Sequence, residues 1–207
     1  MKRSKRSKAK RTGTGLRTMF NILIIAVISV AFVYITDGII THKAYPLKYL
    51  EYIEEYSEQY NVPPNTICAV IETESGFDRL AVSPKGAIGL MQITPETFSW
   101  LCQYTDIGGE YDESLLYDAR TNIKYGTYFM SYLYDKFGSW EVAHAAYNAG
   151  MNRVSTWLKD ESVSKDGELI NIPIAETRRY IEKINKAKKV YYETYFSDVK
   201  GQNNNEG

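Results

Sequence analysis

The most constraining feature of the chain is an uncharged apolar run near its beginning, MFNILIIAVISVAFVYI at residues 19–35. A bilayer core is spanned by about 20 such residues, so the run is at the short end, and residues 36–40 can extend it. Lys and Arg residues precede the run and none follows directly, which predicts a cytoplasmic N-terminus. We therefore expect residues 19–36 to be a single-pass transmembrane signal-anchor in the cell membrane, with the chain beyond Asp37 outside the cytoplasm.

Two other interpretations of the run stay open. Ser29-Val30-Ala31 resembles a small-x-small cleavage site, so the run could be a signal peptide that is removed, which would leave a secreted protein. The run could also be a buried helix of a soluble protein. Its continuation past Ala31 through Ile35 favours the uncleaved anchor.

The net charge of zero is a sum over two unlike parts. Eight of the 25 basic residues lie in residues 1–36, which hold no acidic residue, so residues 37–207 carry 17 basic against 25 acidic residues, a net charge of −8. Next to an apolar run, a basic arm at residues 1–18 indicates membrane topology rather than a nucleic-acid partner, and we expect no nucleic-acid binding.

The exported part is predicted to be one mainly α-helical domain. Residues 37–45 are expected to be a linker, residues 46–196 the domain, and residues 197–207 a disordered tail. Apolar residues recur at helical spacing around 49–60, 123–137 and 180–195. Two further helices are expected to start at Pro63-Pro64 and at Thr94-Pro95, and two more are expected at 139–148 and 151–159. Residues 77–93 are expected to form a loop or small hairpin, and 104–118 and 163–173 to be irregular.

Several kinds of chemistry have no support in the sequence. The two histidines, His42 and His144, are not paired at metal-ligand spacing, and no phosphate-binding glycine motif occurs, so we expect no metal and no cofactor. His144 is expected to be a core or rim residue. Cys68 and Cys102 are interpreted as small buried residues, although an exported chain could also pair them.

Carboxylate chemistry remains. Glu72 and Glu74 lie at the end of a largely apolar helix, and two positions apart they point about 200° from each other, so only one can face a given cleft. Partial burial would raise the pKa of that carboxyl group and allow it to donate a proton near neutral pH. A solvated carboxylate at a helix end is the alternative.

Four ordered blocks resemble the soluble lytic transglycosylase (SLT) family: ESGFDRLAVSPKGAIGLMQ at 74–92, NIKYG at 122–126, AYNAG at 146–150 and PIAETRRYI at 173–181. Arg79 departs from the proline that is usual in the first block. The resemblance covers roughly residues 46–195. It implies a lysozyme-like fold, as in goose-type lysozymes, with a sugar-binding groove between two lobes.

The resemblance also implies an activity. The family cleaves the β-1,4 bond between N-acetylmuramic acid and N-acetylglucosamine in peptidoglycan and leaves a 1,6-anhydro sugar. Its catalytic glutamate corresponds here to Glu74, and one carboxyl group suffices if it acts first as acid and then as base. The expected partners are peptidoglycan glycan strands and, through the N-terminal helix, the membrane; cell-wall or secretion machinery is a further candidate.

The other motif residues are expected to support substrate binding. Ser75 and Ser83 can hydrogen-bond Glu74 or a sugar, Gly89 lets the backbone approach the glycan, and Met91 and Gln92 would line the groove. Tyr147 would orient Glu74 or stabilise positive charge, Asn148 would hold an N-acetyl group, and Glu176 and Tyr180 would border the groove. Core packing is the alternative for Met91, Tyr147 and Tyr180, and helix capping for Ser75 and Glu176.

Two other functions stay open on the sequence. A hydrolytic muramidase would cleave the same bond with a water molecule, but it needs a second, water-positioning acid, for which the sequence favours no residue. A non-catalytic glycan-binding protein on the same scaffold would not need the intact context of Glu74.

Overall fold

The computed structural model describes residues 6–197 and divides the chain into two compact units, Met1–Pro46 and Leu47–Gly207. Residues 1–5 of the basic arm and residues 198–207 of the expected disordered tail lie outside the described residues.

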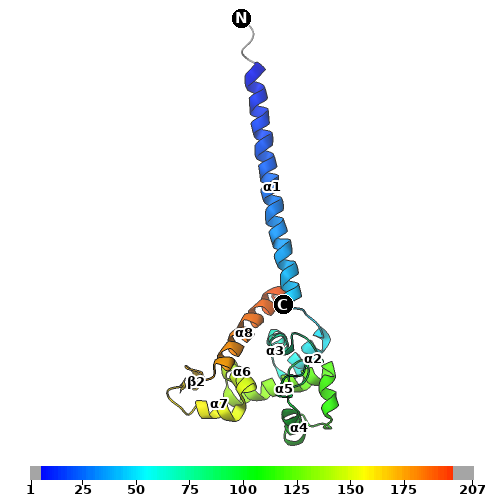
Figure 1. Cartoon of the computed structure of the whole chain (residues 1–207), viewed down its shortest axis with the longest axis vertical. Coiled ribbons are helices and arrows are strands. Elements are labelled where there is room, and N and C mark those ends of the chain that lie inside the picture. The colour runs from blue at the N-terminus through cyan, green and yellow to red at the C-terminus, as the bar shows by residue number, and fades with distance from the viewer. Residues whose placement is uncertain (1–5, 198–207) are drawn as a thin grey trace, which may run out of the picture. The chain divides into compact units, whose positions relative to one another are not determined.

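The first unit contains one long helix, α1 (Arg6–Ala44) (Figure 1). Its segment Arg17–Ala44 contains an 18-residue window with a mean hydropathy of 2.4 and exposes its apolar side chains, which makes it long and apolar enough to cross a membrane. The helix continues through residues 37–44, where the sequence predicts a linker. No proline interrupts this stretch until Pro46, and the helix ends just before it.

The second unit is mainly α-helical, as the sequence predicts. Its elements are α2 (Leu50–Tyr60), α3 (Pro64–Ser75), α4 (Pro95–Tyr104), the 3₁₀ turn η1 (Glu113–Tyr117), α5 (Ala119–Phe137), α6 (Trp140–Ala149), α7 (Met151–Trp157), the strands β1 (Ser164–Lys165) and β2 (Glu168–Leu169), α8 (Ala175–Tyr191) and the π-helical turn η2 (Tyr192–Phe196). The antiparallel β1–β2 pair occupies part of the stretch 163–173 that was expected to be irregular. Asp166 and Gly167 supply the positive φ angles of its two-residue turn.

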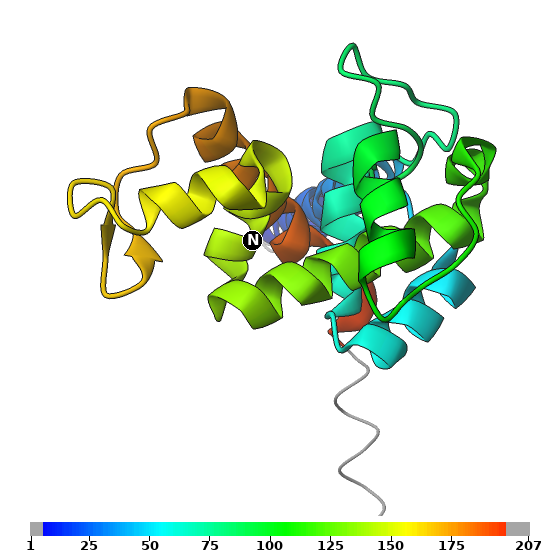
Figure 2. The same ribbon diagram turned by 90° about the horizontal axis from the view of Figure 1, so that it is seen from below.

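The helices form two groups around α5 (Figure 2). In that view α2, α3, α4 and the loop after α3 lie on one side, and α6, α7 and the β1–β2 hairpin lie on the other. Helix α5 packs against α2 and α6, and α8 packs against α3 and α6, so both helices connect the two groups. This arrangement brings the end of α3, the end of α6 and the beginning of α8 together.

Local signals place the helix ends. Thr94 caps α4 by accepting a hydrogen bond from the backbone N–H of Thr97, and Asp118 caps α5 in the same way from Thr121 at 2.8 Å. Pro64 begins α3, and Gly76 ends it in the left-handed conformation with its N–H donating to the Glu72 carbonyl. Helix α3 therefore ends at Ser75, one residue after Glu74.

The core follows the predicted helical faces. Ile53 and Tyr56 of α2 are buried, as are Ile123, Met130 and Leu133 of α5. The α8 stripe buries its apolar residues as well: Tyr180, Ile184, Ala187 and Tyr191. Cys68 and Cys102 are both buried free thiols.

Candidate active site

The carboxyl group of Glu74 lies where three helices meet. Glu74 is in the last turn of α3, and the groups that perturb its titration, Tyr180 and Glu176, come from α8. Its own charge in turn raises the pKa of Tyr147 in α6. Burial raises the pKa of Glu74 to about 7, and the negative charge of Glu176 adds to this rise. Interaction with the Tyr180 hydroxyl stabilises the ionised form and offsets part of it. Glu74 can therefore both give and take a proton near neutral pH.

Two tyrosines stand beside this carboxyl group, Tyr180 buried and Tyr147 half-buried. The Tyr147 hydroxyl donates a hydrogen bond to the Met91 carbonyl at 2.8 Å. The Tyr180 hydroxyl is buried and has no partner at hydrogen-bond distance among the described residues. Burial, followed by the charge of Glu74, raises the pKa of both phenols, so both stay protonated. Each tyrosine thus presents a neutral hydroxyl close to the catalytic candidate.

Glu72 faces a different environment from Glu74. It accepts a long hydrogen bond of 3.5 Å from the hydroxyl of Tyr191, and burial raises its pKa, an effect opposed by this bond and by Lys48. The two carboxylates have different partners, as the helical geometry predicts.

Ser75 ties the end of α3 to the following loop. Its hydroxyl lies 2.8 Å from the Leu90 carbonyl and 3.1 Å from the Ile71 carbonyl of its own helix. The hydroxyl proton is thereby directed to backbone oxygens and not to Glu74. The geometry indicates a positioning role for Ser75 at the junction between α3 and residues 88–93.

Asn122 organises that loop and was given no role in the sequence analysis. Its side chain is buried, accepts a hydrogen bond from the Met91 N–H at 2.8 Å, and donates to the carbonyls of Ile88 and Leu116 at 3.0 and 2.8 Å. The contacts with Met91 and Ile88 join α5 to the segment that carries the GLMQ motif, and the contact with Leu116 joins it to η1. The NIKYG block was the available signal, because it places an asparagine in an otherwise apolar helical face.

Gly89 is required by packing as well as by backbone conformation. Its φ is +79°, and a Cβ atom there would lie 2.3 Å from the Asn122 amide nitrogen and 2.4 Å from the Leu116 carbonyl. Gly89 is itself buried, so its small size serves the close packing of the loop on α5 rather than an open glycan surface. Gly86, with a φ of +77°, has open space around the same position.

Met91 and Gln92 use their side chains within the protein. The Met91 side chain is fully buried, with 0% exposed, and packs against Gly126, which is the core packing given above as the alternative to lining the groove. Its backbone carbonyl accepts the hydrogen bond from Tyr147. The Gln92 amide donates to the carbonyls of Ala81 and Gly89 at 3.1 and 2.9 Å. Neither side chain offers a free hydrogen-bond donor to a ligand in this arrangement.

The three remaining motif residues occupy different places. The Ser83 hydroxyl accepts a hydrogen bond from the Ala87 N–H at 3.0 Å within the loop. The side-chain oxygen Oδ1 of Asn148 accepts one from the Thr177 hydroxyl at 2.8 Å. Glu176 is exposed at the first turn of α8 and pairs with Lys85 at 3.8 Å. This ion pair brings the loop that holds Ser83 to the start of α8, next to Glu176, whose negative charge raises the pKa of Glu74.

A groove of about 580 Å³ begins at Tyr147 and runs between α4, α5 and the α6–α7 junction. Trp100 and Phe129 stand edge-on 6.2 Å apart, and Phe129 lies 5.3 Å from the ring of Tyr147. Asn152 and Arg153 at the start of α7 add polar groups to the lining. No sequence motif marks these residues as lining a groove.

Other reactive groups do not form a second centre. Within residues 6–197 no three His, Cys, Asp or Glu side chains are grouped so that they could hold a metal ion. His144 is buried in α6, and burial, followed by the charge of Lys188, lowers its pKa to about 3, so this imidazole is neutral. Neither of its ring nitrogens has a hydrogen-bond partner among the described residues.

Comparison with known proteins agrees with this geometry. The family described as "Transglycosylase SLT domain" matches residues 51–170. Soluble lytic murein transglycosylase of Escherichia coli K12 is 34% identical over 157 residues, which cover 74% of this chain and 24% of that protein. Membrane-bound lytic murein transglycosylase C of Glaesserella parasuis is 27% identical and is covered over 46% of its length.

Solved structures show the same fold. The crystal structure of the 70-kDa soluble lytic transglycosylase from Escherichia coli superposes with a TM-score of 0.67 at 32% identity, over 74% of this chain and 25% of that one. An inactive mutant of the Pseudomonas aeruginosa lytic transglycosylase Slt gives 0.64 at 28% identity, over 72% and 24%. The chain thus spans about a quarter of the length of the soluble relatives.

The expected lysozyme-like, mainly α-helical fold is confirmed by these superpositions. The four sequence blocks converge around one perturbed glutamate, and the family match covers more than half of the chain. The protein belongs to the SLT family of transglycosylase domains.

Proposed function

We propose that this chain is a peptidoglycan lytic transglycosylase that cleaves the β-1,4 bond between N-acetylmuramic acid and N-acetylglucosamine. The observation that carries the proposal is the carboxyl group of Glu74, whose pKa is raised to about 7 at the junction of α3, α6 and α8. The names of the related murein transglycosylases support the substrate class. Residues 46–196 would be the catalytic domain.

In the first step Glu74 acts as a general acid. Its protonated carboxyl group donates the proton to the glycosidic oxygen, the bond from that oxygen to the muramic acid C1 breaks, and N-acetylglucosamine leaves with a free hydroxyl. Positive charge develops on C1 and the ring oxygen. Glu74 is now ionised, and its negative charge opposes the charge on the sugar.

In the second step the same residue acts as a general base. The Glu74 carboxylate takes the proton of the muramic acid C6 hydroxyl, and O6 forms a bond to C1, which closes the 1,6-anhydro ring. Glu74 ends protonated, as it began, and no water is consumed. A pKa near the working pH serves both steps, because neither protonation state is strongly disfavoured.

The surrounding residues would position the acid and the strand. Tyr180 would keep Glu74 oriented through its neutral hydroxyl, and Glu176 would hold its pKa up. Tyr147, whose hydroxyl donates to the Met91 carbonyl, would hold the neighbouring loop in place. Ser75 would act by anchoring the end of α3. The remaining predicted binding residues would shape the loop and the groove walls from within the protein: Ser83, Gly89, Met91, Gln92 and Asn148.

We further propose that residues 19–36 anchor the enzyme by a single membrane pass with the N-terminus in the cytoplasm. The length and hydropathy of α1 support a span, and the basic residues before it support the orientation. The catalytic domain would then face the peptidoglycan, which is the glycan partner the reaction needs. Cell-wall or secretion machinery would decide where the anchored enzyme acts.

Product analysis tests the reaction. Purified peptidoglycan is digested with the full chain in detergent, and the released fragments are weighed by mass spectrometry. We expect 1,6-anhydromuramic acid ends, lighter by one water than hydrolysed ends, and a loss of about 10²- to 10⁴-fold in Glu74→Gln. Reducing-end muramic acid alone would indicate a hydrolytic muramidase, and turnover that persists in Glu74→Gln would show that another group is the acid.

A further inference from the structure

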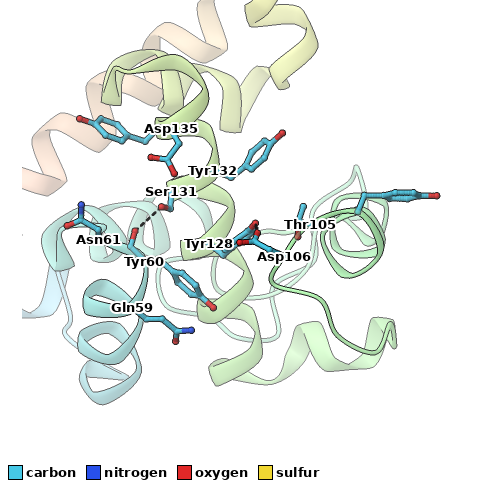
Figure 3. A pocket seen from close by; sticks show the side chains of 11 residues that line it. Gln59, Tyr60, Asn61, Thr105, Asp106, Tyr128, Ser131, Tyr132 and Asp135 are labelled. Atoms are coloured by element: carbon cyan, nitrogen blue, oxygen red, sulfur yellow. Dashed lines mark hydrogen bonds between the residues drawn. The ribbon is translucent and has the colours of Figure 1, made fainter.

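A second cavity of about 630 Å³ lies beside α5 (Figure 3). Its walls come from the end of α2, the segment that follows α4, and the middle of α5. The volume is within the ~300–1,000 Å³ range of small-molecule sites. It shares no lining residue with the groove at Tyr147, and none of the catalytic candidates borders it.

Five tyrosines line this cavity: Tyr60, Tyr104, Tyr128, Tyr132 and Tyr134. Tyr60 and Tyr128 meet edge to face with ring centroids 5.4 Å apart, so each holds the other in place. Tyr104 is 74% exposed at the rim, so its ring is available to a ligand. Rigid aromatic faces suit flat, weakly polar surfaces such as the C–H face of a sugar ring.

Besides hydroxyls, the polar groups of the cavity are amides and carboxylates. Gln59 and Asn61 supply both donors and acceptors, and Asp106 and Asp135 supply acceptors. The hydroxyl of Tyr128 donates to Asp106, which orients that carboxylate. No Lys or Arg belongs to the lining, so an anionic ligand would be repelled. Neutral sugars, with many hydroxyls and an amide, match this set.

The cavity adjoins the groove through one aromatic contact and along α5. Trp100 lines the groove, and its ring stands edge-on 5.2 Å from Tyr132, which lines the cavity. Phe129 of the groove and Tyr128 of the cavity are consecutive on α5. A long ligand in the groove can therefore continue over Trp100 and Tyr132 into the cavity.

We propose that this cavity is a second, non-catalytic binding site for uncharged N-acetylated sugar units of a glycan strand. It holds a part of the strand that lies beyond the groove, and so favours long strands over short ones. The inference rests on the proposed function for the identity of the strand. Binding itself does not depend on turnover, which allows the two to be tested apart.

The experiment measures binding to chitin oligosaccharides, which are uncharged chains of N-acetylglucosamine, because peptide-free peptidoglycan strands carry a lactyl carboxylate on every muramic acid. The full chain carrying Glu74→Gln is kept in detergent, and its Kd is determined for long oligosaccharides and for a single disaccharide. We expect the ratio of the two affinities to fall about threefold to tenfold in Tyr104→Ala and in Asp135→Ala. Tyr192→Ala and Glu182→Ala remove an exposed tyrosine and an exposed carboxylate elsewhere and are expected to preserve the ratio.

The outcomes separate the alternatives. Because Tyr104 and Asp135 are exposed, melting curves matching the parent are expected and confirm folding. An unchanged ratio in both variants would overturn the glycan site. The glycan site would also be overturned if the two variants bound a lysine-bearing stem peptide more weakly while their binding to the oligosaccharides was unchanged. That result would indicate a site for a cationic group. Anhydro products together with an unchanged ratio would refute only this inference, whereas a Tyr104-dependent ratio without anhydro products would refute only the proposed reaction.

Discussion

The hydroxyl of Tyr180 lies close enough to the carboxyl group of Glu74 to favour its ionised form, and it has no partner at hydrogen-bond distance among the described residues. Tyr180 belongs to α8 and Glu74 to α3, two helices that pack against each other across the domain. This hydroxyl lowers the pKa of Glu74, while burial and Glu176 raise it. The acid–base behaviour of the site therefore depends on groups that the fold brings to α3.

Tyr180→Phe and Glu176→Gln are expected to shift the pH profile in opposite directions. The acid step needs protonated Glu74, so kcat should fall as pH rises through about 7. Removing the Tyr180 hydroxyl takes away a group that lowers the pKa, so the alkaline limb should move to higher pH. Removing the Glu176 charge should move it to lower pH. Initial rates of anhydro-product release between pH 5 and 9 measure both; equal shifts of one sign would contradict the arrangement.

Glu74→Gln is expected to stabilise the folded protein at neutral and alkaline pH. The pKa of Glu74 is raised in the folded state, so from about pH 4.5 to 7 the unfolded chain ionises first and the wild-type free energy of unfolding falls. The variant escapes this cost. Its gain should be near zero at pH 4 and reach at most about 3 kcal/mol above pH 7. Urea unfolding of both chains measures it, with the exposed Glu182→Gln as a control for surface charge; a gain that is largest at pH 4 would be inconsistent.

Gly89→Ala should destabilise the protein much more than Gly86→Ala. Both glycines have positive φ, which costs an alanine about 1 kcal/mol. Only at Gly89 would the new Cβ collide with the Asn122 amide and the Leu116 carbonyl, adding about 1–3 kcal/mol of overpacking. Urea midpoints of the two variants make the comparison, and similar losses would show that backbone conformation alone governs this loop.

His144→Leu is expected to increase stability, most clearly in acid. The variant removes two buried ring nitrogens that lack partners, which is worth about 1–2 kcal/mol. The pKa of His144 is lowered to about 3 in the folded state, so the wild type loses stability as pH falls from about 6.5 towards 3, and the variant should not share this loss. Melting temperatures at pH 7 and pH 4 test this; a smaller gain at pH 4 than at pH 7 would argue for a protonated imidazole.

The sequence by itself determined the local features of this protein. The helices begin at Pro64 and after Thr94 and end at Gly76 and Gly138 because capping and φ preferences act over a few residues. The separation of Glu72 from Glu74 follows from the helical repeat alone. The apolar run at residues 19–35, which lies within α1, can also be recognised from the sequence alone.

Only the tertiary structure decided which side chains serve the substrate and which serve the fold. Met91 and Gln92 belong to the most recognisable motif, yet their side chains are used inside the protein, while Trp100 and Phe129 line the groove without any motif. Desolvation and charge interactions depend on neighbours from distant parts of the chain. The pKa of Glu74 could therefore be assigned only once α8 had placed Tyr180 and Glu176 beside it.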